Sequence, residues 1–220
     1  MIAAPPIVFD LDGTLIDSAP DIHAAVARML VAEGQEPLAL ATIRSFIGNG
    51  VAVLVERVME ATGLGGPGEH LRLLARFQAE YDAAPSALTK VFVGVRGALA
   101  GLRDAGHPLG ICTNKPEATS RAILRDLGLQ PFFSAVVGGD SLPVRKPLPE
   151  PLLHTFRLLG AESGLYVGDS EVDGETAVAA TVPFFLFTRG YRKGDVGTIP
   201  HLWAFDDFAD LPAQIARAAQ

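Results

Sequence analysis

The chain has 220 residues, of which 49 % are hydrophobic, and its formal net charge is −7. This balance fits one globular, enzyme-sized unit and excludes a disordered or collagen-like chain. The excess of acidic residues leaves no broad basic face, so we expect neither nucleic acid nor an anionic membrane as a main partner. No window approaches the roughly 18 consecutive apolar residues of a membrane span.

Cysteine use and the first residues of the chain predict a soluble, cytoplasmic protein. The single cysteine, Cys112, cannot form an internal disulfide. Residues 1–6 lack both the basic region and the long apolar region of a secretion signal. The sequence gives no indication of the oligomeric state.

Five short apolar runs predict fully buried β-strands, because polar residues do not alternate within them. In chain order they are residues 7–9, 109–112, 135–137, 165–167 and 184–187. Helical stretches lie between them, such as 98–105 and 118–127, each closed by a glycine, Gly106 or Gly128. This alternation predicts an α/β fold with a Rossmann-like, doubly wound parallel sheet and helices on both faces.

Residues 17–87 break the alternation, because they contain helical periodicity and no convincing strand. We expect a separate helical domain there, with residues 1–16 and 88–220 forming the α/β core. Ser18 is expected to cap the first helix, and residues 63–68 to form a turn-rich joint. The expected helices carry three apolar stripes: Ile22, Val26, Met29 and Leu30; Val51, Leu54, Val55 and Val58; and Leu71, Leu74, Phe77 and Tyr81.

Two carboxylates, Asp10 and Asp12, follow the first apolar run in the motif DLDGT. In an extended chain, residues two apart point to the same side. A lone aspartate after a strand is commonly a turn former or a helix cap. Open parallel sheets, however, bind ligands at the carboxyl ends of their strands, so the pair also predicts a ligand site.

Further polar residues follow other predicted strands and are expected at the same edge of the sheet. Thr113 and Asn114 follow the second run, and Asp169 and Asp173 follow the fourth. Acids that converge on one edge repel one another unless a cation lies among them, and oxygen ligands of this kind suit Mg²⁺. Lys146 precedes a proline, a setting that taken alone is typical of a surface lysine.

The order of these elements resembles the four motifs of the haloacid dehalogenase superfamily, over essentially the whole chain. The elements are Asp-x-Asp, Thr, Lys-Pro and Gly-Asp-x-x-x-Asp. The resemblance implies that Asp10 is the nucleophile, which becomes an aspartyl phosphate, and that Asp12 is the general acid and later the base. The dehalogenase branch lacks a carboxylate at the second position, so Asp12 favours phosphoryl transfer.

The same resemblance implies a Mg²⁺ site formed by the Asp10 side chain, the backbone carbonyl of Asp12 and the Asp169 side chain. Asp173 would orient the catalytic lysine or a water molecule. A purely structural role for Asp173, in a network at the start of a helix, is the alternative.

Three further residues are expected at the transferring phosphoryl group. The Thr113 hydroxyl and the backbone N–H of Asn114 would donate hydrogen bonds to a phosphoryl oxygen. Lys146 would supply positive charge where negative charge spreads in the transition state.

The helical insertion resembles the superfamily's helical cap, which closes over the site and excludes water. Its segment FIGNGV, residues 46–51, is similar to the cap loop of bacterial phosphoglycolate phosphatases. Gly48, Asn49 and Gly50 are therefore expected to bind substrate, because glycines allow close backbone approach and a helix start can receive a carboxylate. A simple joint between two helices is the alternative.

The implied activity is that of a Mg²⁺-dependent phosphoric monoester hydrolase that converts 2-phosphoglycolate to glycolate and phosphate. Its partner would be a small phosphate monoester. The alternatives are a related capped phosphatase, a phosphoglucomutase that returns the phosphoryl group to a sugar, or a catalytically silent binding module. Retention of the motif residues disfavours the silent module.

The remaining polar residues receive no firm chemical role. Arg57 could serve the cap's own packing, and the basic loop of Arg189, Arg192 and Lys193 is expected to be solvated, with substrate contact as the alternative. Cys112 is interpreted as a buried strand residue. The five histidines show no metal-ligand spacing.

Overall fold

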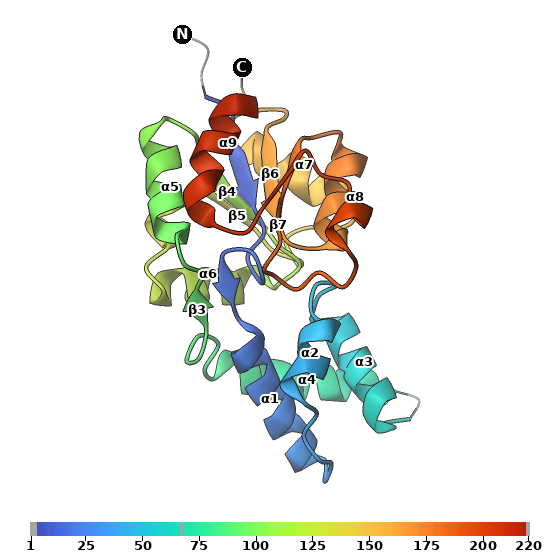
Figure 1. Cartoon of the computed structure of the whole chain (residues 1–220). Helices are drawn as coiled ribbons and strands as arrows, with labels where there is room; N and C mark the ends of the chain where they lie inside the picture. Colours follow the sequence, from blue (N-terminus) through green and yellow to red (C-terminus); the bar gives the residue numbers. More distant parts are fainter. Residues whose placement is uncertain (1–3, 67, 219–220) are drawn as a thin grey trace.

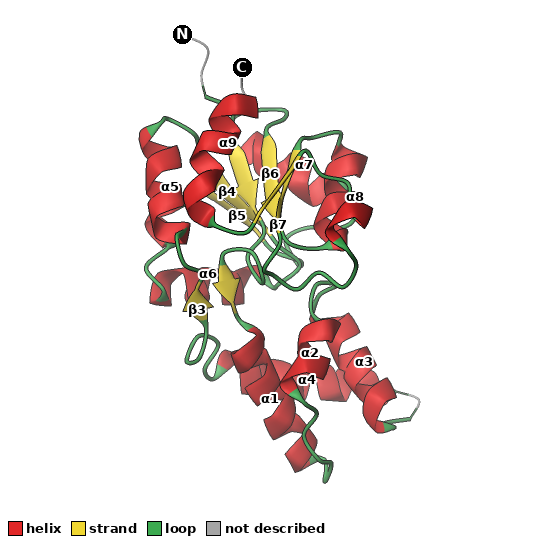
Figure 2. Cartoon of the chain, in the orientation of Figure 1, coloured by secondary structure: helices red, strands yellow, loops and turns green. Residues whose placement is uncertain are grey.

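A six-stranded sheet forms the centre of the molecule in the computed structural model, which describes residues 4–66 and 68–218 (Figures 1 and 2). Its strand order is β5-β4-β1-β6-β7-β8, and every neighbouring pair is parallel. The strands are β1 (Ile7–Phe9), β4 (Leu109–Cys112), β5 (Ala135–Val137), β6 (Leu165–Gly168), β7 (Phe184–Phe187) and β8 (Trp203–Phe205). The predicted α/β fold and its five strands are confirmed.

Helices cover both faces of this sheet. They are α5 (Val95–Asp104), α6 (Glu117–Asp126), α7 (Glu150–Leu158), α8 (Glu171–Ala180) and α9 (Leu211–Ala218). Side chains alternate across β1, so that Ile7 and Phe9 join the core that includes α5, α6 and α9, whereas Val8 joins the core that includes α7 and α8. Burial on both faces explains why the strands are apolar at successive positions.

The chain order places β1 between β4 and β6, which are the strands that carry the other predicted motifs. Ile7 pairs with Leu109 on one side and with Leu165 on the other. The chain runs outward from β1 to β4 and β5, and then returns across β1 to β6. Ligands bind at such a reversal of strand order, and β1 delivers the DLDGT motif there.

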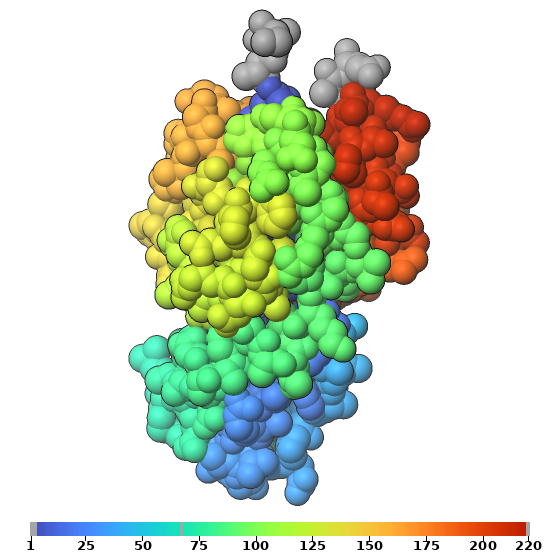
Figure 3. Space-filling model, turned by 90° about the vertical axis from the view of Figure 1, so that its left-hand side faces the viewer, coloured from blue at the N-terminus to red at the C-terminus, as the bar shows by residue number. Residues whose placement is uncertain are grey.

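Four helices form a second unit beyond the carboxyl ends of the strands (Figure 1). They are α1 (Ala19–Ala32), α2 (Leu40–Phe46), α3 (Val51–Thr62) and α4 (Glu69–Asp82). The α1 helix packs against α2 and α4, and α3 packs against both as well. In Figure 3 the blue and cyan surface of this unit lies directly against the green and yellow surface of the core. The exact domain boundaries stay a prediction.

Two short strands connect the helical unit to the core. Strand β2 (Ile16–Asp17) pairs antiparallel with β3 (Lys90–Val91), so the outgoing and returning chains are joined by a two-residue ladder. The apolar pattern missed this pair because two residues are too few to show a period. It also missed β8, an edge strand in which Trp203 is 44 % exposed.

Two details of the helical unit correct the sequence prediction. Ser18 precedes α1, but its hydroxyl makes no capping hydrogen bond and instead donates to Asp12 Oδ1 at 2.5 Å. In α4 the buried stripe contains Leu73, Phe77 and Tyr81, whereas Leu71 is 73 % exposed. Residues 73, 77 and 81 are four apart and share one helix face, so the predicted stripe began at the wrong leucine. Gly106 and Gly128 follow α5 and α6 with positive φ, as expected for helix ends.

Candidate active site

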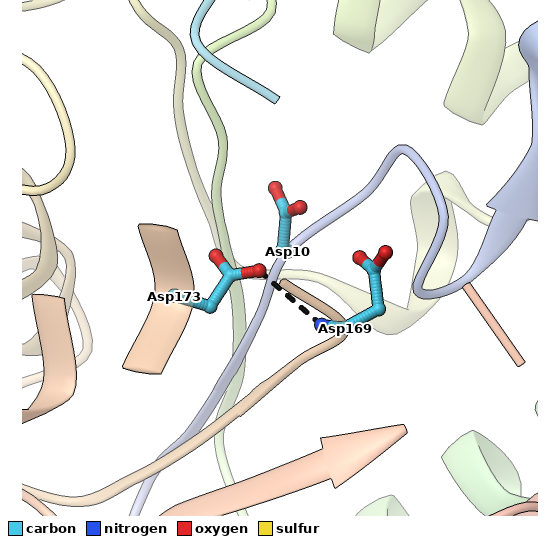
Figure 4. A group of neighbouring side chains, drawn as sticks. All are labelled: Asp10, Asp169 and Asp173. Atoms are coloured by element: carbon cyan, nitrogen blue, oxygen red, sulfur yellow. Dashed lines mark hydrogen bonds between the residues drawn. The ribbon is translucent and has the colours of Figure 1, made fainter. Parts of the chain in front are cut away.

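Three carboxylates meet at the carboxyl edge of the sheet (Figure 4). Asp10 follows β1, and its N–H donates to Val167 O of β6 at 2.9 Å. Asp169 follows β6, and Asp173 lies in the first turn of α8. One carboxylate oxygen from each of the three lies within 4.8 Å of the others. The predicted convergence of acids from separate elements is therefore present in the structure.

The Asp169 carboxylate is fixed by two donors. Thr14 Oγ1 donates to Oδ1 at 2.7 Å, and the Tyr191 N–H donates to Oδ2 at 2.5 Å. A Cβ atom on Gly13 or Gly190 would overlap this carboxylate, so both positions require glycine. Burial and the neighbouring charges of Asp173 and Asp10 raise the pKa of Asp169 well above its ordinary value.

Asp173 is already surrounded by hydrogen-bond donors. Its Oδ1 accepts from Lys146 Nζ at 2.7 Å and from the Tyr166 hydroxyl at 2.6 Å. Its Oδ2 accepts from the Ser170 hydroxyl at 2.7 Å and from the N–H groups of Asp169 and Ser170 at 3.2 Å each. Burial opposes ionisation, but these donors, led by Lys146, lower the pKa of Asp173. The contacts of Asp173 fit both of its expected roles. It holds Lys146, and it accepts hydrogen bonds from Ser170 at the start of α8.

The carboxylate of Asp10 has the weakest set of partners. Its Oδ1 forms an ion pair with Lys146 Nζ at 2.9 Å, but among the described residues this buried oxygen has no partner with hydrogen-bond geometry. Burial raises the pKa of Asp10 to about 7, with Lys146 opposing the shift and Asp173 adding to it. Although burial alone would lower it, attraction to Asp10 and Asp173 raises the pKa of Lys146 and keeps it cationic.

The acid cluster fits a cation held mainly by Asp10 and Asp169. The Asp10 oxygen paired with Lys146 lacks a well-directed hydrogen bond, and a metal ion beside it would supply a further positive partner. Asp173 is less available as a ligand, because both of its oxygens already accept hydrogen bonds. The donor set consists of oxygen atoms only, as hard divalent cations require.

Asp12 occupies a separate position beside Asp10. Lys115 Nζ donates to its two oxygens at 3.0 Å and 2.8 Å, and the Ser18 hydroxyl donates to Oδ1. The same ammonium lies 4.7 Å from the ring centroid of Tyr81 in α4. Lys115 was given no role from the sequence, where a lysine before a proline is typical of the surface, but it is only 6 % exposed. The signal was its place directly after Thr113 and Asn114.

Asn114 connects the core to the helical unit. Its Nδ2 donates to Gly48 O and to Lys146 O, both at 3.0 Å, and its Oδ1 accepts from Lys146 N–H at 3.0 Å. Its side chain therefore holds the loop that carries Lys146. The preceding residue, Thr113, is buried. A Cβ on Gly139 would overlap Asn114 O, which shows how closely the loops pack here.

A pocket lies between the acid edge and the helical unit, with about 470 Å³ of empty space including its mouth. The core contributes polar side chains to the wall, and the helical unit contributes mainly apolar ones. The lining residues are Asp10, Asp12, Thr113, Asn114 and Lys115 from the core, and Ile22, Ile47, Gly48, Gly50, Val51, Leu54, Phe77 and Tyr81 from the helices.

The predicted cap loop reaches this pocket in part. Gly48 and Gly50 line it, and both have positive φ, which favours glycine. Asn49 is not among the lining residues. Its Oδ1 accepts from Arg57 Nη2 at 3.0 Å, and Arg57 Nη1 donates to Phe46 O at 2.8 Å. Arg57 thus shapes the loop from within the cap, and a substrate contact of Asn49 stays a prediction.

Other residues singled out in the sequence lie away from the pocket. Arg189 pairs with Asp206 at an exposed site, and Arg192 donates to two backbone carbonyls of its own loop. Cys112 is fully buried in β4, as expected, and burial raises the pKa of its thiol to about 12. Four histidines bond backbone carbonyls: His23, His70, His107 and His201. Within the described part of the chain, no helix is long and apolar enough to cross a membrane.

Fold and site together define a doubly wound α/β protein with a carboxylate cluster at the switch point of a parallel sheet and a helical unit inserted after the first strand. The family model of haloacid dehalogenase-like hydrolases matches residues 7–187. The chain belongs to this family.

Relatives of known name cover nearly the whole chain. A phosphoglycolate phosphatase of Cereibacter sphaeroides is 51 % identical over 215 residues, which are 97 % of this chain and 98 % of that protein. One from Rhodobacter capsulatus is 42 % identical over 95 % of each chain. The crystal structure of a predicted phosphoglycolate phosphatase from Haemophilus somnus is similar with a TM-score of 0.91, at 29 % identity and full coverage of both chains.

Proposed function

We propose that this protein is a phosphoglycolate phosphatase that hydrolyses 2-phosphoglycolate to glycolate and phosphate. The pocket supports this proposal, because Asp10 lines it and, among the described residues, one Asp10 oxygen has an ion pair with Lys146 but no partner with hydrogen-bond geometry. The relatives of 51 % and 42 % identity bear this name. The partner is therefore a small phosphate monoester, and a cytoplasmic location stays a prediction.

Asp10 is the nucleophile in this proposal. One of its oxygens forms a bond to phosphorus as the bond from phosphorus to the glycolate oxygen breaks, which leaves an aspartyl phosphate on the enzyme. Water then attacks phosphorus, the bond to Asp10 breaks, and phosphate is released. Dividing the displacement into two steps lets one buried carboxylate serve as both attacking and leaving group.

Asp12 moves the protons in both steps. It gives a proton to the glycolate oxygen as that oxygen leaves, and its carboxylate then takes a proton from the attacking water. Its place in the pocket wall next to Asp10 supports this role. Lys115 now bonds both of its oxygens, so this contact must change when substrate enters.

Positive charge and hydrogen-bond donors surround the transferring group. Lys146 lies 2.9 Å from Asp10, and Thr113 with the Asn114 N–H provides donors on the neighbouring loop. We further propose that Asp10, Asp169 and the backbone carbonyl of Asp12 hold Mg²⁺, which would shield the phosphate dianion from the carboxylate that attacks it. The four helices would act as a cap that excludes water from the pocket.

The proposal is tested with a panel of small phosphate monoesters at equal concentration, assayed for phosphate release with Mg²⁺. We expect 2-phosphoglycolate to have the highest kcat/KM. A sugar phosphate or another small ester in first place would leave the phosphatase chemistry standing and overturn the substrate. Conversion of a sugar phosphate to its isomer without phosphate release would instead indicate a mutase.

A further inference from the structure

A buried lysine and an unpaired hydroxyl lie side by side in the pocket wall. Lys115 is 6 % exposed and Tyr81 is 1 % exposed, and the Lys115 ammonium lies 4.7 Å from the centroid of the Tyr81 ring. The Phe77 ring stacks on the Tyr81 ring, with 5.7 Å between their centroids, and fixes its orientation. Within the part of the chain that the structure describes, the Tyr81 hydroxyl has no partner with hydrogen-bond geometry, and the Lys115 ammonium is the charged group beside it. A buried hydroxyl without a partner is costly, so this group is suited to a ligand atom that arrives later.

Lys115 is the cationic member of the pocket wall. Lys146 lies deeper, beyond the lining residues, and already contacts Asp10, Asp173 and Tyr166. Arg145 approaches from outside, where its Nη1 would lie 3.2 Å from a Cβ on Gly50. Among the described residues that line the pocket, Lys115 is therefore the cation that an anionic group of a ligand can contact.

Lys115 is paired with Asp12, which is the proposed general acid and base of the reaction. Asp12 accepts from Lys115 through both oxygens, yet it must reach the oxygen that leaves phosphorus. A buried ammonium deprived of its carboxylate requires another anion in the same place. In 2-phosphoglycolate the carboxylate is separated from the leaving oxygen by one carbon, so a ligand whose oxygen reaches Asp12 brings its carboxylate next to Lys115.

We propose that Lys115 and the Tyr81 hydroxyl form the site for the substrate's carboxylate, and that this carboxylate replaces Asp12 as the partner of Lys115. The substrate class is then phosphate monoesters of short 2-hydroxy acids. An ester without a carboxylate leaves Lys115 on Asp12 and leaves Tyr81 unpaired, so it binds less well and reacts more slowly. The inference rests on the proposed function and names the residues that select its substrate.

The test compares two phosphonates that differ only in the group of interest. In 3-phosphonopropionate a methylene replaces the ester oxygen of 2-phosphoglycolate, and in propylphosphonate a methyl also replaces the carboxylate. Binding of each to the full-length protein with Mg²⁺ is measured by calorimetry. We expect the wild type to prefer the carboxylate ligand, and Lys115→Met to reduce that preference about 10- to 100-fold. Tyr81→Phe should reduce it about 3- to 10-fold.

Matched variants separate recognition from packing. Lys115→Arg should retain part of the preference, because it keeps the charge, and Arg145→Met should retain all of it. If Lys115→Met does not fold, Lys115→Gln, which keeps a donor for Asp12 and lacks the charge, replaces it. Kinetics on 2-phosphoglycolate and ethyl phosphate give the second readout, in which Lys115→Met should lose far more kcat/KM on the first.

Three other results would contradict either the role of Lys115 or the proposed substrate. A wild-type preference that Lys115→Met retains, or that Arg145→Met abolishes, would overturn the assignment of Lys115 and leave the proposed function standing. Equal losses on both ligands would reduce Lys115 to a packing residue. A wild type that binds both phosphonates equally would contradict the proposed substrate itself.

Discussion

Asp10 combines two properties that suit a nucleophile and no structural role. It is buried, and its Oδ1 finds no partner with hydrogen-bond geometry in residues 4–66 and 68–218, although Lys146 Nζ pairs with it at 2.9 Å. A carboxylate retained for stability would be expected to accept hydrogen bonds through both oxygens, as Asp173 does. Asp10 therefore keeps an oxygen that can take a ligand or metal contact in addition to its ion pair with Lys146.

The substitution Asp10→Asn should abolish turnover while the protein remains folded. The amide keeps the shape of the carboxylate but is a far weaker nucleophile, so we expect a loss of at least ~10³-fold, or about 4 kcal/mol of barrier. Steady-state kinetics with a circular-dichroism check of folding measures this. A folded variant that keeps more than about a tenth of the wild-type rate would remove Asp10 from the nucleophilic role.

For Asp12→Asn the loss should depend on the leaving group. An aryl phosphate releases an oxygen that needs no proton, so this variant should form the aspartyl phosphate faster from an aryl than from an alkyl phosphate. Hydrolysis of the intermediate should be slow in both cases, because the base is missing. Single-turnover measurements separate the two steps, and equal losses on both substrates in the first step would contradict the acid role.

The sequence predicted the site residues that directly follow a strand. It did not predict a site residue whose burial depends on distant parts of the chain. The spacing of the DLDGT motif and the ends of the apolar runs located Asp10, Asp169 and their neighbours. Lys115 escaped because its burial depends on Asp12 and Tyr81, which are 103 and 34 positions away in the chain. No local pattern reports a contact of that range.

At the scale of elements, the loop after β7 joins the acid cluster to the helical unit. The N–H of Tyr191 donates to Asp169, and its hydroxyl accepts from the N–H of Ala19, the first residue of α1, at 3.0 Å. The hydroxyl also donates to Asp17 of β2 at 2.7 Å. One side chain thus satisfies a free donor at the start of α1 and holds the connecting strand in place.

Removing this hydroxyl should destabilise the protein. Tyr191→Phe leaves the Ala19 N–H without its acceptor and removes one of the two donors to Asp17 Oδ1, which keeps Arg44 at 3.2 Å. We therefore expect the free energy of unfolding to fall by about 1–2 kcal/mol. Urea unfolding measures the change. Tyr81→Phe is the matched control and should not lower stability, because the Tyr81 hydroxyl has no partner with hydrogen-bond geometry among the described residues. Equal losses in the two variants would show that the Tyr191 hydroxyl does not secure α1.

The sequence predicted the strands that are buried along their whole length. It missed the partly exposed edge strand and chose the wrong leucine for the buried face of α4. The runs that form β1, β4 and β7 are buried on both faces and are therefore apolar throughout. The edge strand β8 is partly exposed, and its sequence WAF lacks such a run. In α4 the sequence offers three leucines, Leu71, Leu73 and Leu74, and only packing against the other helices selects Leu73 over Leu71 for the buried face.

For the whole molecule, the topology explains why acids distant in sequence come together at all. The sequence predicted a parallel sheet but not its order, which depends on pairing between strands more than 100 residues apart, such as Ile7 with Leu109. Folding therefore assembles mutually repelling carboxylates, and it does so against their electrostatic repulsion. Without a cation, this repulsion lowers the stability of the folded state.

Mg²⁺ should consequently stabilise the whole fold and not only support turnover. A ligand present at about 100 times its Kd adds about 2.7 kcal/mol to the free energy of unfolding, which for a chain of this size raises Tm by roughly 5–10 °C. Differential scanning calorimetry after chelation and again with Mg²⁺ measures the shift. Asp169→Asn should lose most of it, because a cation ligand becomes neutral, whereas Asp206→Asn, at an exposed ion pair with Arg189, should keep it. An unchanged Tm in the wild type at concentrations that saturate activity would show that the cation does not bind between Asp10 and Asp169.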